Sequence, residues 1–247
     1  MTADAQADRP CRLGVLAFGD SITNGGGELQ WGVALQSWAL WVARATGVSF
    51  TSYAVDGANV ENVVKFQIPA LRSYSADPDA RYELGCLYIG ANDVRALDWD
   101  PVAFERGFRG ALAFLDERCE RTLTMTVPLD LGRPRAGARN VGECNEAIER
   151  VASEHQTSLV DLRLFGARNL LMPDHVHPTA FGQIAIAERA LAVLGEAPDP
   201  LPTRVPPRQM IFFETDWLGR LRGDLSYTYR HARVSAQAAG LLPRWRL

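Results

Sequence analysis

The chain has 247 residues, 47% of them hydrophobic, and a formal net charge of −3 at pH 7. This length and apolar content suit one large α/β domain with a sizeable core. The weak negative charge gives no general reason to expect nucleic acid or an anionic membrane as a partner, and no apolar run approaches the ~18 residues of a membrane span.

Composition also bears on the compartment and the source. The first ten residues are polar and lack the basic-then-apolar pattern of a signal peptide. The four cysteines, at positions 11, 86, 119 and 144, show no CxxC spacing, and three of them fall in expected strands or near a helix end, which favours buried free thiols over disulfides. We therefore expect a cytoplasmic protein. Nearly all cationic side chains are arginines, a bias typical of high-GC bacterial genomes.

In the first half of the chain, short apolar runs alternate with segments of helical spacing. Leu13–Phe18 is β-like, and Trp31–Thr46 places its apolar residues at helical intervals. Ser49–Val55 then predicts a second strand, and Asn59–Leu71 predicts a helix with an irregularity near its proline. Leu84–Ile89 is continuously apolar, as in a strand buried on both faces of a parallel sheet.

The second half repeats the alternation. A helix begins at Asp100, an N-cap followed by proline, and should reach about Glu117. Thr122–Val127 is strand-like and Asn140–His155 helical, before a short strand at Leu159–Leu162 and a last clear helix over Thr179–Leu194. Strands that alternate with helices predict βαβ units. The expected fold is a three-layer αβα sandwich, flavodoxin-like, on a mainly parallel sheet of about five strands.

The character of the chain changes at Pro198. Five prolines between Pro198 and Pro207 predict an extended linker, and residues 204–247 then contain eight arginines against three acids, together with several aromatic side chains. This segment is too short for an independent domain with a strong core. We therefore divide the chain into a main domain, residues 1–197, and a C-terminal arm, residues 198–247. The arm is expected to pack on its own domain or clasp a neighbouring subunit, to cover the site as a lid, or to bind anionic partners.

Three short motifs lie where a strand ends or a helix begins, which is where open α/β sheets place their chemistry. They are Gly19-Asp20-Ser21, Gly90-Ala91-Asn92-Asp93 and Asp174-His175-Val176-His177. A serine, an oxyanion donor, a histidine and a carboxylate are what ester cleavage without a metal requires. The combination predicts a serine hydrolase.

Each of these residues also has a plainer interpretation. Ser21 needs a base to become a nucleophile, and it could instead be a turn or helix-capping serine. His177 is the best base, with Asp174 three residues earlier to fix its tautomer, although a lone DxxH can be a surface loop. Asn92 and the strand-ending Gly57 could donate hydrogen bonds to an oxyanion, or could serve as a cap and a turn.

Two rival sites compete with this hypothesis. Asp174, His175 and His177 resemble metal ligands, but no further histidine falls at a strand end to complete a shell. Three glycines at 25–27 could suggest phosphate binding, yet the sequence has neither GK[ST] nor GxGxxG. We expect no metal and no cofactor, and we expect His175 to be a loop or lining residue.

The joint pattern is more specific than its parts. The blocks GDS, a strand-terminal glycine, GxND and DxxH occur in an order that resembles the SGNH hydrolase family, also called GDSL-type esterases and lipases. The resemblance runs from about Leu13 to Leu194, with Ile22 in place of the commoner leucine. The triad that it implies is Ser21, Asp174 and His177. The oxyanion hole that it implies consists of the Ser21 N–H, Gly57 and Asn92.

These roles predict a serine esterase that cleaves a carboxylic ester of a small molecule, sugar or lipid through an acyl-enzyme. Two alternatives remain: transfer of the acyl group to a specific acceptor by the same triad, and a non-catalytic binding module on the same fold. The motifs leave both parts of the ester open. Trp31 and the loop Pro128–Gly137 are candidates to line the substrate site, whereas Trp38 and Trp41 are expected in the core. We also expect no nucleic-acid partner, and a homo-oligomer built through the arm is one hypothesis.

Overall fold

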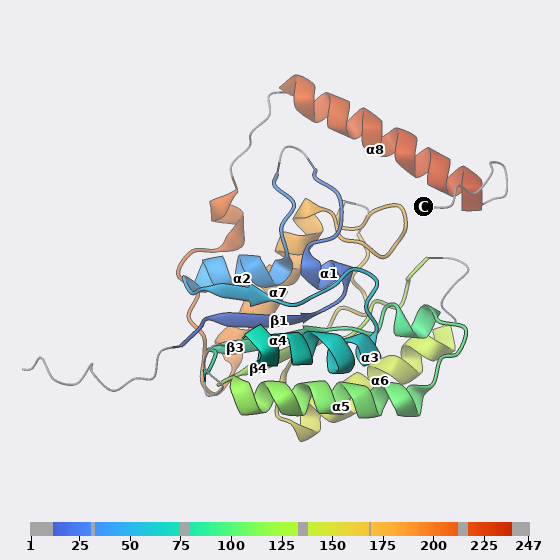
Figure 1. The fold of residues 1–247 in the computed structure, drawn as a ribbon. Coiled ribbons are helices and arrows are strands. Elements are labelled where there is room, and N and C mark those ends of the chain that lie inside the picture. The colour runs from blue at the N-terminus through green and yellow to red at the C-terminus, as the bar shows by residue number, and fades with distance from the viewer. Residues whose placement is uncertain are drawn as a thin grey trace, which may run out of the picture.

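A five-stranded parallel sheet forms the centre of the protein (Figure 1). The computed structural model describes residues 12–30, 33–74, 80–132, 138–167, 169–211 and 217–238. The strands are β1 (Val15–Gly19), β2 (Phe50–Ser52), β3 (Leu84–Tyr88), β4 (Thr122–Met125) and β5 (Ser158–Val160). All four strand pairs are parallel, in the order β2-β1-β3-β4-β5. The parallel sheet expected from the sequence is confirmed, with edge strands β2 and β5 shorter than predicted.

The strand order places a topological switch at β1. The chain passes from β1 to β2 on one side and continues in β3 on the other side. In open α/β sheets, ligands bind in the crevice outside the carboxyl ends of the strands at such a point. The last residues of β1 and β3, Gly19 and Tyr88, are partners in the sheet register, so the segments that follow them begin side by side.

Helices cover both faces of the sheet, as a three-layer sandwich requires (Figure 1). One layer consists of α2 (Trp38–Thr46) and α7 (Ala180–Glu196), which pack against each other. The other layer consists of α3 (Val60–Asn62), the π-helical η1 (Val63–Gln67), α4 (Ile68–Tyr74), α5 (Pro101–Arg118) and α6 (Ala138–Glu154). Short helical segments are α1 (Ser21–Asn24), η2 (Asp93–Arg95) and η3 (Pro207–Met210).

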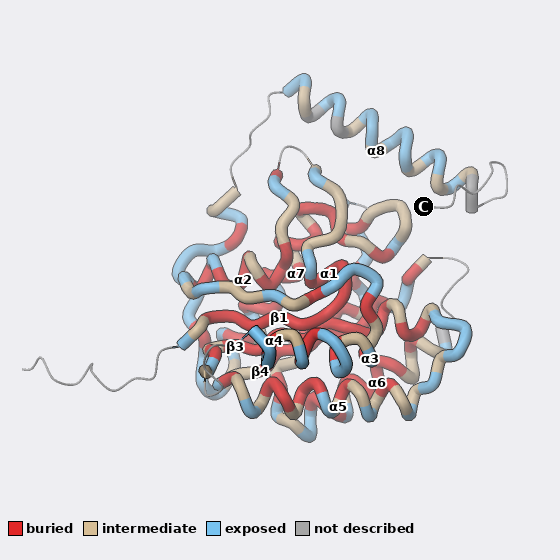
Figure 2. The backbone as a smooth tube through the Cα atoms, in the orientation of Figure 1, coloured by how far each residue is buried: buried red, intermediate tan, exposed pale blue. Residues whose placement is uncertain are grey.

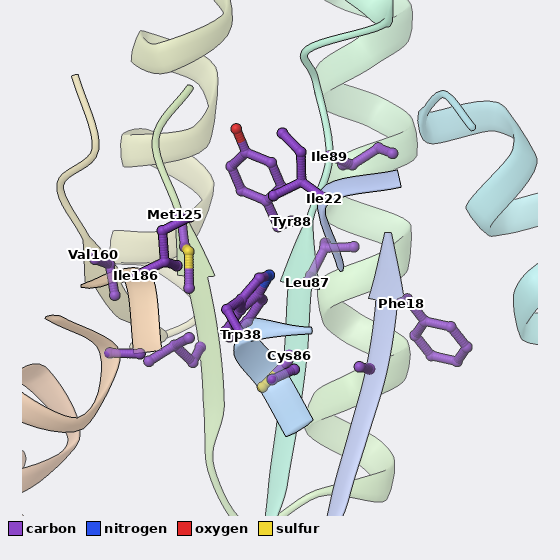
Figure 3. Close-up of a cluster of buried hydrophobic side chains, with 14 of the residues drawn as sticks. Phe18, Ile22, Trp38, Cys86, Leu87, Tyr88, Ile89, Met125, Val160 and Ile186 are labelled. Carbon is purple, nitrogen blue, oxygen red and sulfur yellow. The ribbon is translucent and has the colours of Figure 1, made fainter. Parts of the chain in front are cut away.

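The core lies on both sides of the sheet, and every residue of β1 and β3 is buried (Figure 2). Phe18 points toward α5, where its ring centroid lies 6.1 Å from that of Phe114. Trp38 lies on the opposite side of β1 (Figure 3) and is fully buried, and Trp41 is buried with it. The prediction that these two tryptophans belong to the core is confirmed.

Two helix starts follow the capping signals of the sequence. The Asp100 carboxylate accepts hydrogen bonds from the amides of Val102 and Ala103, at 2.9 and 3.1 Å, and so caps α5. Thr179 caps α7 by accepting from the Gly182 amide at 3.1 Å. Because α7 follows the DxxH motif directly, its cap fixes where the motif loop ends.

Two helices differ from the prediction. The helix expected from Trp31 begins at Trp38, because the Ser37 side chain accepts from the Ala39 amide at 3.2 Å and caps the helix there. Trp31 itself lies outside the described residues. The helix expected from residue 59 is interrupted by η1 just before Pro69. Proline has no N–H to bond the carbonyl four residues earlier, and a π-helical turn accommodates that loss.

The C-terminal arm contains a helix that the sequence analysis did not anticipate. This helix, α8 (Trp217–Ala238), stands apart from the layers around the sheet (Figure 1). Arg230 of α8 forms an ion pair with Glu28 at 2.6 Å, so the helix touches the loop after α1. Five large apolar side chains of α8 are exposed: Trp217, Leu218, Leu221, Leu225 and Tyr229.

The cysteines and the helices bear on two further expectations. Cys86, Cys119 and Cys144 are free and buried, as predicted, whereas Cys11 lies outside the described residues. In the part of the chain that the structure describes, no helix is both long and apolar enough to cross a bilayer.

Candidate active site

Ser21, His177 and Asp174 form a continuous hydrogen-bonded relay. The Ser21 Oγ lies 2.9 Å from His177 Nε2, and His177 Nδ1 lies 2.6 Å from Asp174 Oδ2. Ser21 lies two residues after the end of β1, while the other two side chains come from the loop before α7. A serine, an imidazole and a carboxylate in this sequence of contacts can activate the hydroxyl as a nucleophile. The structure thus brings Ser21 to a histidine and a carboxylate that lie more than 150 positions later in the chain.

Ser21 is held at the first position of α1 by the residue before it. Asp20 is 1% exposed, and its Oδ1 accepts from the Ile22 amide at 2.9 Å, which caps the short helix. The first amides of a helix have no partner within the helix. The Ser21 N–H is therefore suited to receive negative charge that develops on a substrate oxygen.

Two buried glutamines that the sequence analysis missed brace this turn. Gln67 of η1 donates from Nε2 to the carbonyl of Gly19 at 2.7 Å and accepts at Oε1 from the Gly19 amide at 3.0 Å. Gln183 of α7 donates to the carbonyls of Ile22 and Gly26, at 3.0 and 3.1 Å. The sequence holds only a weak sign of their role, which is that both are polar residues on otherwise apolar helix faces. Such positions require internal partners once they are buried.

Asp174 orients its own loop as well as the imidazole ring. Its Oδ1 accepts from the backbone amides of Val176 and His177, at 2.9 and 3.0 Å, while Oδ2 faces the ring. The His177 carbonyl accepts in turn from the Met172 amide at 2.8 Å. These bonds tie the backbone of the loop and the direction of the imidazole to one carboxylate.

The same contacts shift the two pKa values in opposite directions. The hydrogen bond with Asp174 raises the pKa of His177 above its ordinary 6.5, against the opposing effect of burial. Burial acts to raise the pKa of Asp174, but the hydrogen bonds from the His177 ring and from two backbone amides outweigh it and hold that pKa below 3.8. The carboxylate is therefore charged at neutral pH and can stabilise an imidazolium.

Asn92 and Gly57 are linked through the residue next to Gly57. Asn92 follows β3, and its Nδ2 donates to the carbonyl of Ala58 at 2.9 Å. Gly57 has φ of +74°, and a Cβ added there would meet nothing within 4 Å, so glycine is favoured for its backbone conformation and not for space. A primary amide has two N–H groups. One of them can hold the Gly57 loop while the other faces an oxyanion.

Two buried carboxyls support the site without joining the relay. Burial raises the pKa of Asp20 to about 7 and that of Asp93 to about 6. Asp93 Oδ1 accepts from the Val60 amide at 3.0 Å and so fixes the start of α3. Within the described ranges, the second oxygen of each carboxyl has no hydrogen-bond partner. The charge of Asp20 also contributes to the raised pKa of His177.

Of the three side chains considered as metal ligands, Asp174 and His177 lie together, and His175 does not join them. His177 faces Asp174, whereas His175 Nδ1 lies 2.9 Å from Asp130 Oδ2 on the loop after β4. Among the residues that the structure describes, no three histidine, cysteine, aspartate or glutamate side chains are grouped so that they could hold a metal ion. His175 is thus an exposed loop residue with a specific partner.

A cavity of about 520 Å³ lies between α3, η1 and α5. Asn59, Val60 and Asp93 contribute to its lining, but the relay residues do not, so the relay does not open into it. Of the loop Pro128–Gly137 considered for substrate contact, residues 133–137 lie outside the described residues, as does Trp31.

Solved structures of similar fold include ester hydrolases. Axe2, an acetylxylan esterase from Geobacillus stearothermophilus, is 18% identical, with a TM-score of 0.56 over 74% of this chain and 94% of that one. A member of the lipolytic protein G-D-S-L family from Veillonella parvula DSM 2008 is 22% identical, with a TM-score of 0.59 over 74% and 99% of the two chains. LAE5, an alpha/beta hydrolase enzyme from the metagenome of Lake Arreo, Spain, is 20% identical, with a TM-score of 0.55 over 73% and 94%. At these identities the likeness shows the fold alone.

The family is shown by the sequence. A search of curated proteins finds no match to this chain. The model of the GDSL-like lipase/acylhydrolase family matches residues 17–184, which is more than half of the chain. The matched span includes the three relay residues, Gly57 and Asn92. The chain therefore belongs to the GDSL-like lipase/acylhydrolase family and is an ester-hydrolysing serine hydrolase.

Proposed function

We propose that this protein hydrolyses a carboxylic ester through an acyl-enzyme, with Ser21 as nucleophile, His177 as general base and Asp174 as the orienting carboxylate. The observation that supports this most strongly is the unbroken relay, with 2.9 Å from Ser21 Oγ to His177 Nε2 and 2.6 Å from His177 Nδ1 to Asp174 Oδ2. These residues suffice for ester cleavage without a cofactor.

Acylation follows from the order of these contacts. His177 Nε2 takes the proton of Ser21 as Oγ attacks the ester carbonyl carbon, and Asp174 stabilises the imidazolium that forms. Three donors, the N–H groups of Ser21 and Gly57 and the side-chain amide of Asn92, hold the tetrahedral oxyanion. When the intermediate collapses, the carbon–oxygen bond to the alcohol breaks and the alcohol leaves with the proton from His177. The acyl group remains on Ser21.

Deacylation repeats the same steps with water. His177 removes a proton from water as the water oxygen attacks the acyl carbon, and the same donors hold the second oxyanion. Collapse returns the proton to Ser21 Oγ and releases the carboxylic acid. An acyltransferase would differ only here, because an acceptor hydroxyl or amine would replace water.

We propose a small-molecule, sugar or lipid ester as the substrate class. The similarity of fold to an acetylxylan esterase makes acetylated sugars one class to include in a test. The formal charge of −3 also favours a small-molecule substrate over nucleic acid.

A panel of esters tests this function. Acyl esters of varied chain length, including acetylated sugars, would be offered to the wild type and to Ser21→Ala, and free acid and alcohol would both be quantified. We expect turnover by the wild type and loss of it in Ser21→Ala with unchanged thermal unfolding. Full activity in the variant would contradict the role of Ser21. Acid release that requires an added acceptor, with the acyl group recovered on it, would favour acyl transfer.

We further propose that residues 1–197 form the catalytic domain and that residues 198–247 form an arm that clasps a second copy of the chain. Support comes from the exposed apolar side chains of α8, which include Leu221 and Leu225. Large apolar side chains gathered on one exposed helix are typical of an interaction surface. Truncation after Pro198 should reduce the molecular mass in light scattering while ester turnover persists. Changed turnover at constant mass would instead identify α8 as a lid.

We also propose a cytoplasmic location. The three buried free cysteines support it, because thiols persist in a reducing compartment. Fractionation of the source cells with an antibody would test this, and recovery from the culture medium would contradict it.

A further inference from the structure

His175 has a backbone conformation that its side chain does not favour. Its φ is +62°, in the left-handed region, where a non-glycine residue crowds its own Cβ. It lies between Asp174 and His177, the two members of the relay that share this loop. Strained backbone of this kind persists only where surrounding contacts impose it, and it concentrates at functional sites.

The side chain of His175 contacts the loop after β4. Asp130 Oδ2 lies 2.9 Å from His175 Nδ1, and Asp130 Oδ1 accepts from the Gly132 amide at 3.0 Å. One carboxylate therefore joins two loops and also shapes its own. The His175 amide donates to the Met172 carbonyl at 3.0 Å, which closes the turn on the other side.

Gly132 shows how closely the two loops approach. Its φ is +73°, and a Cβ added there would lie 2.7 Å from the backbone carbonyl oxygen of Asp174. No side chain fits at that distance without a shift of the Asp174 backbone. The β4 loop thus packs directly against the residue that orients the proposed general base.

We infer that Asp130 is a positioning residue, which holds His175 in the left-handed conformation so that Asp174 keeps its three hydrogen bonds to the motif loop. The inference rests on the proposed function, because it gives Asp130 and His175 a task in that site. If residue 175 relaxed to a right-handed conformation, the amides of Val176 and His177 would turn away from Asp174 Oδ1. The ring of His177 would then lose its fixed direction.

The exposure of the pair defines what kind of effect to expect. The His175 and Asp130 side chains are 49% and 73% exposed, and a polar contact in such a setting adds little to global stability. Its effect should therefore appear in kcat and in the pKa of His177, and not in the unfolding midpoint.

The test compares alanine and glycine at position 175. Asp130→Ala and His175→Ala should each lower kcat about tenfold or more, since small misplacements of catalytic groups have effects of this size. KM should stay within about twofold, as expected when only the reacting geometry changes. His175→Gly should keep near wild-type kcat, because glycine adopts the left-handed conformation without a brace. In the His175→Gly background, Asp130→Ala should have no further effect on kcat. In the wild-type background, Asp130→Asn can still accept a hydrogen bond, so its kcat should lie between those of the wild type and Asp130→Ala.

A pH profile supplies a readout that a merely structural contact would not move. Asp174 raises the pKa of His177, so His175→Ala should shift the acidic limb of kcat/KM to lower pH, and His175→Gly should not. Gln156 is a matched control, because it also has positive φ, at +55°. It precedes β5 and so lies at the amino ends of the strands, whereas the candidate site lies beyond their carboxyl ends. Gln156→Ala should leave kcat and the profile unchanged.

Three results would overturn the inference. Equal losses in His175→Gly and His175→Ala would mean that the imidazole acts directly, and a rise in KM alone would mean that it contacts substrate. Wild-type kinetics in all variants would mean that the pair has no role. Failure of the proposed function is distinguishable, because Ser21→Ala would then keep full turnover whatever the position-175 variants do.

Discussion

Gln67 bonds both the amide and the carbonyl of Gly19, at 3.0 and 2.7 Å, and Gly19 lies two residues before Ser21. The glutamine is 2% exposed and belongs to the π-helical turn that precedes Pro69. The last residue of β1 is therefore held by a side chain 48 positions later in the chain. We therefore expect the position of the proposed nucleophile to depend on this pair of hydrogen bonds, the Gln67 clamp.

Removal of the clamp should affect both stability and catalysis. Gln67→Ala leaves buried backbone groups of Gly19 without these partners, at a cost of roughly 1–3 kcal/mol in the free energy of unfolding. Because the turn that holds Ser21 loosens, kcat should fall about tenfold. Denaturant unfolding and steady-state kinetics measure the two effects. Thr124→Ala is the control, since it removes a buried hydrogen bond to the Leu87 carbonyl and should cost stability alone. Unchanged kcat in Gln67→Ala would contradict the role of the clamp.

The pH dependence of activity should follow the titration of His177. The base must be neutral to accept a proton, and Asp174 raises its pKa above 6.5, so kcat/KM should rise with pH through a midpoint above that value. Asp174→Asn removes the main cause of the raised pKa. The variant should have a much lower kcat and an acidic limb at lower pH. A limb that does not move would show that another group is titrating.

Loss of the Asn92 amide should reduce the rate of acylation. Where such oxyanion donors have been removed, kcat has fallen by about 10²–10³-fold, or roughly 3–4 kcal/mol. Asn92→Ala should show a loss in this range, with part of it caused by release of the Gly57 loop. Asn140→Ala is a suitable control, because Asn140 also donates from its side chain to a backbone carbonyl, that of Val94, at 3.3 Å. Similar kinetics in the two variants would argue against Asn92 as a donor to the oxyanion.

Asp20 should make the protein less stable as the pH rises. Burial raises its pKa to about 7 in the folded protein, from 3.8. Stability that depends on the protonated form is complete below pH 3.8 and is lost as the pH rises through about 7. Asp20→Asn keeps an acceptor for the Ile22 amide but has no carboxyl to titrate. As the pH rises from 4 to 8, the free energy of unfolding of the variant should therefore increase relative to that of the wild type, by up to roughly 4 kcal/mol.

Denaturant titrations of both proteins across that pH range would measure the difference. Asp161→Asn provides a control, because the pKa of Asp161 is shifted in the opposite direction: hydrogen bonds with Arg163 lower it to about 2. Its difference from the wild type should be constant between pH 5 and 8. A constant difference for Asp20→Asn as well would mean that Asp20 is charged in the folded protein throughout.

Local signals in the sequence predicted most of the sheet and the relay. Buried strands such as β3 are continuous apolar runs, and the N-caps Asp100 and Thr179 fix helix starts through their own side chains. Carboxyl ends of parallel strands meet at one edge. Motifs that follow strands could therefore be expected to converge before any distance was known, as Ser21 and His177 do.

Features that depend on tertiary contacts could not be predicted in this way. Gln67 and Gln183 act through carbonyls that are distant in sequence, and a buried glutamine has no local signature. The helix expected from Trp31 begins later because Ser37 caps it, a choice that helical periodicity alone does not reveal. His175, which has a left-handed conformation, has its side-chain partner Asp130 45 positions away. Helix α8 was missed because many of its described large apolar side chains, such as Leu221 and Leu225, are exposed, so no buried face marks it as a helix of the domain.

The proposed nucleophile can be tested most directly by covalent labelling. The wild type would be treated with an activated phosphonate ester, digested, and mapped by mass spectrometry, with His177→Ala and Ser21→Ala treated in parallel. We expect one adduct, on the peptide that contains Ser21, formed at a rate that falls sharply in His177→Ala and with no adduct in Ser21→Ala. An adduct on another residue, or equal labelling of Ser21 with and without His177, would contradict the proposed relay.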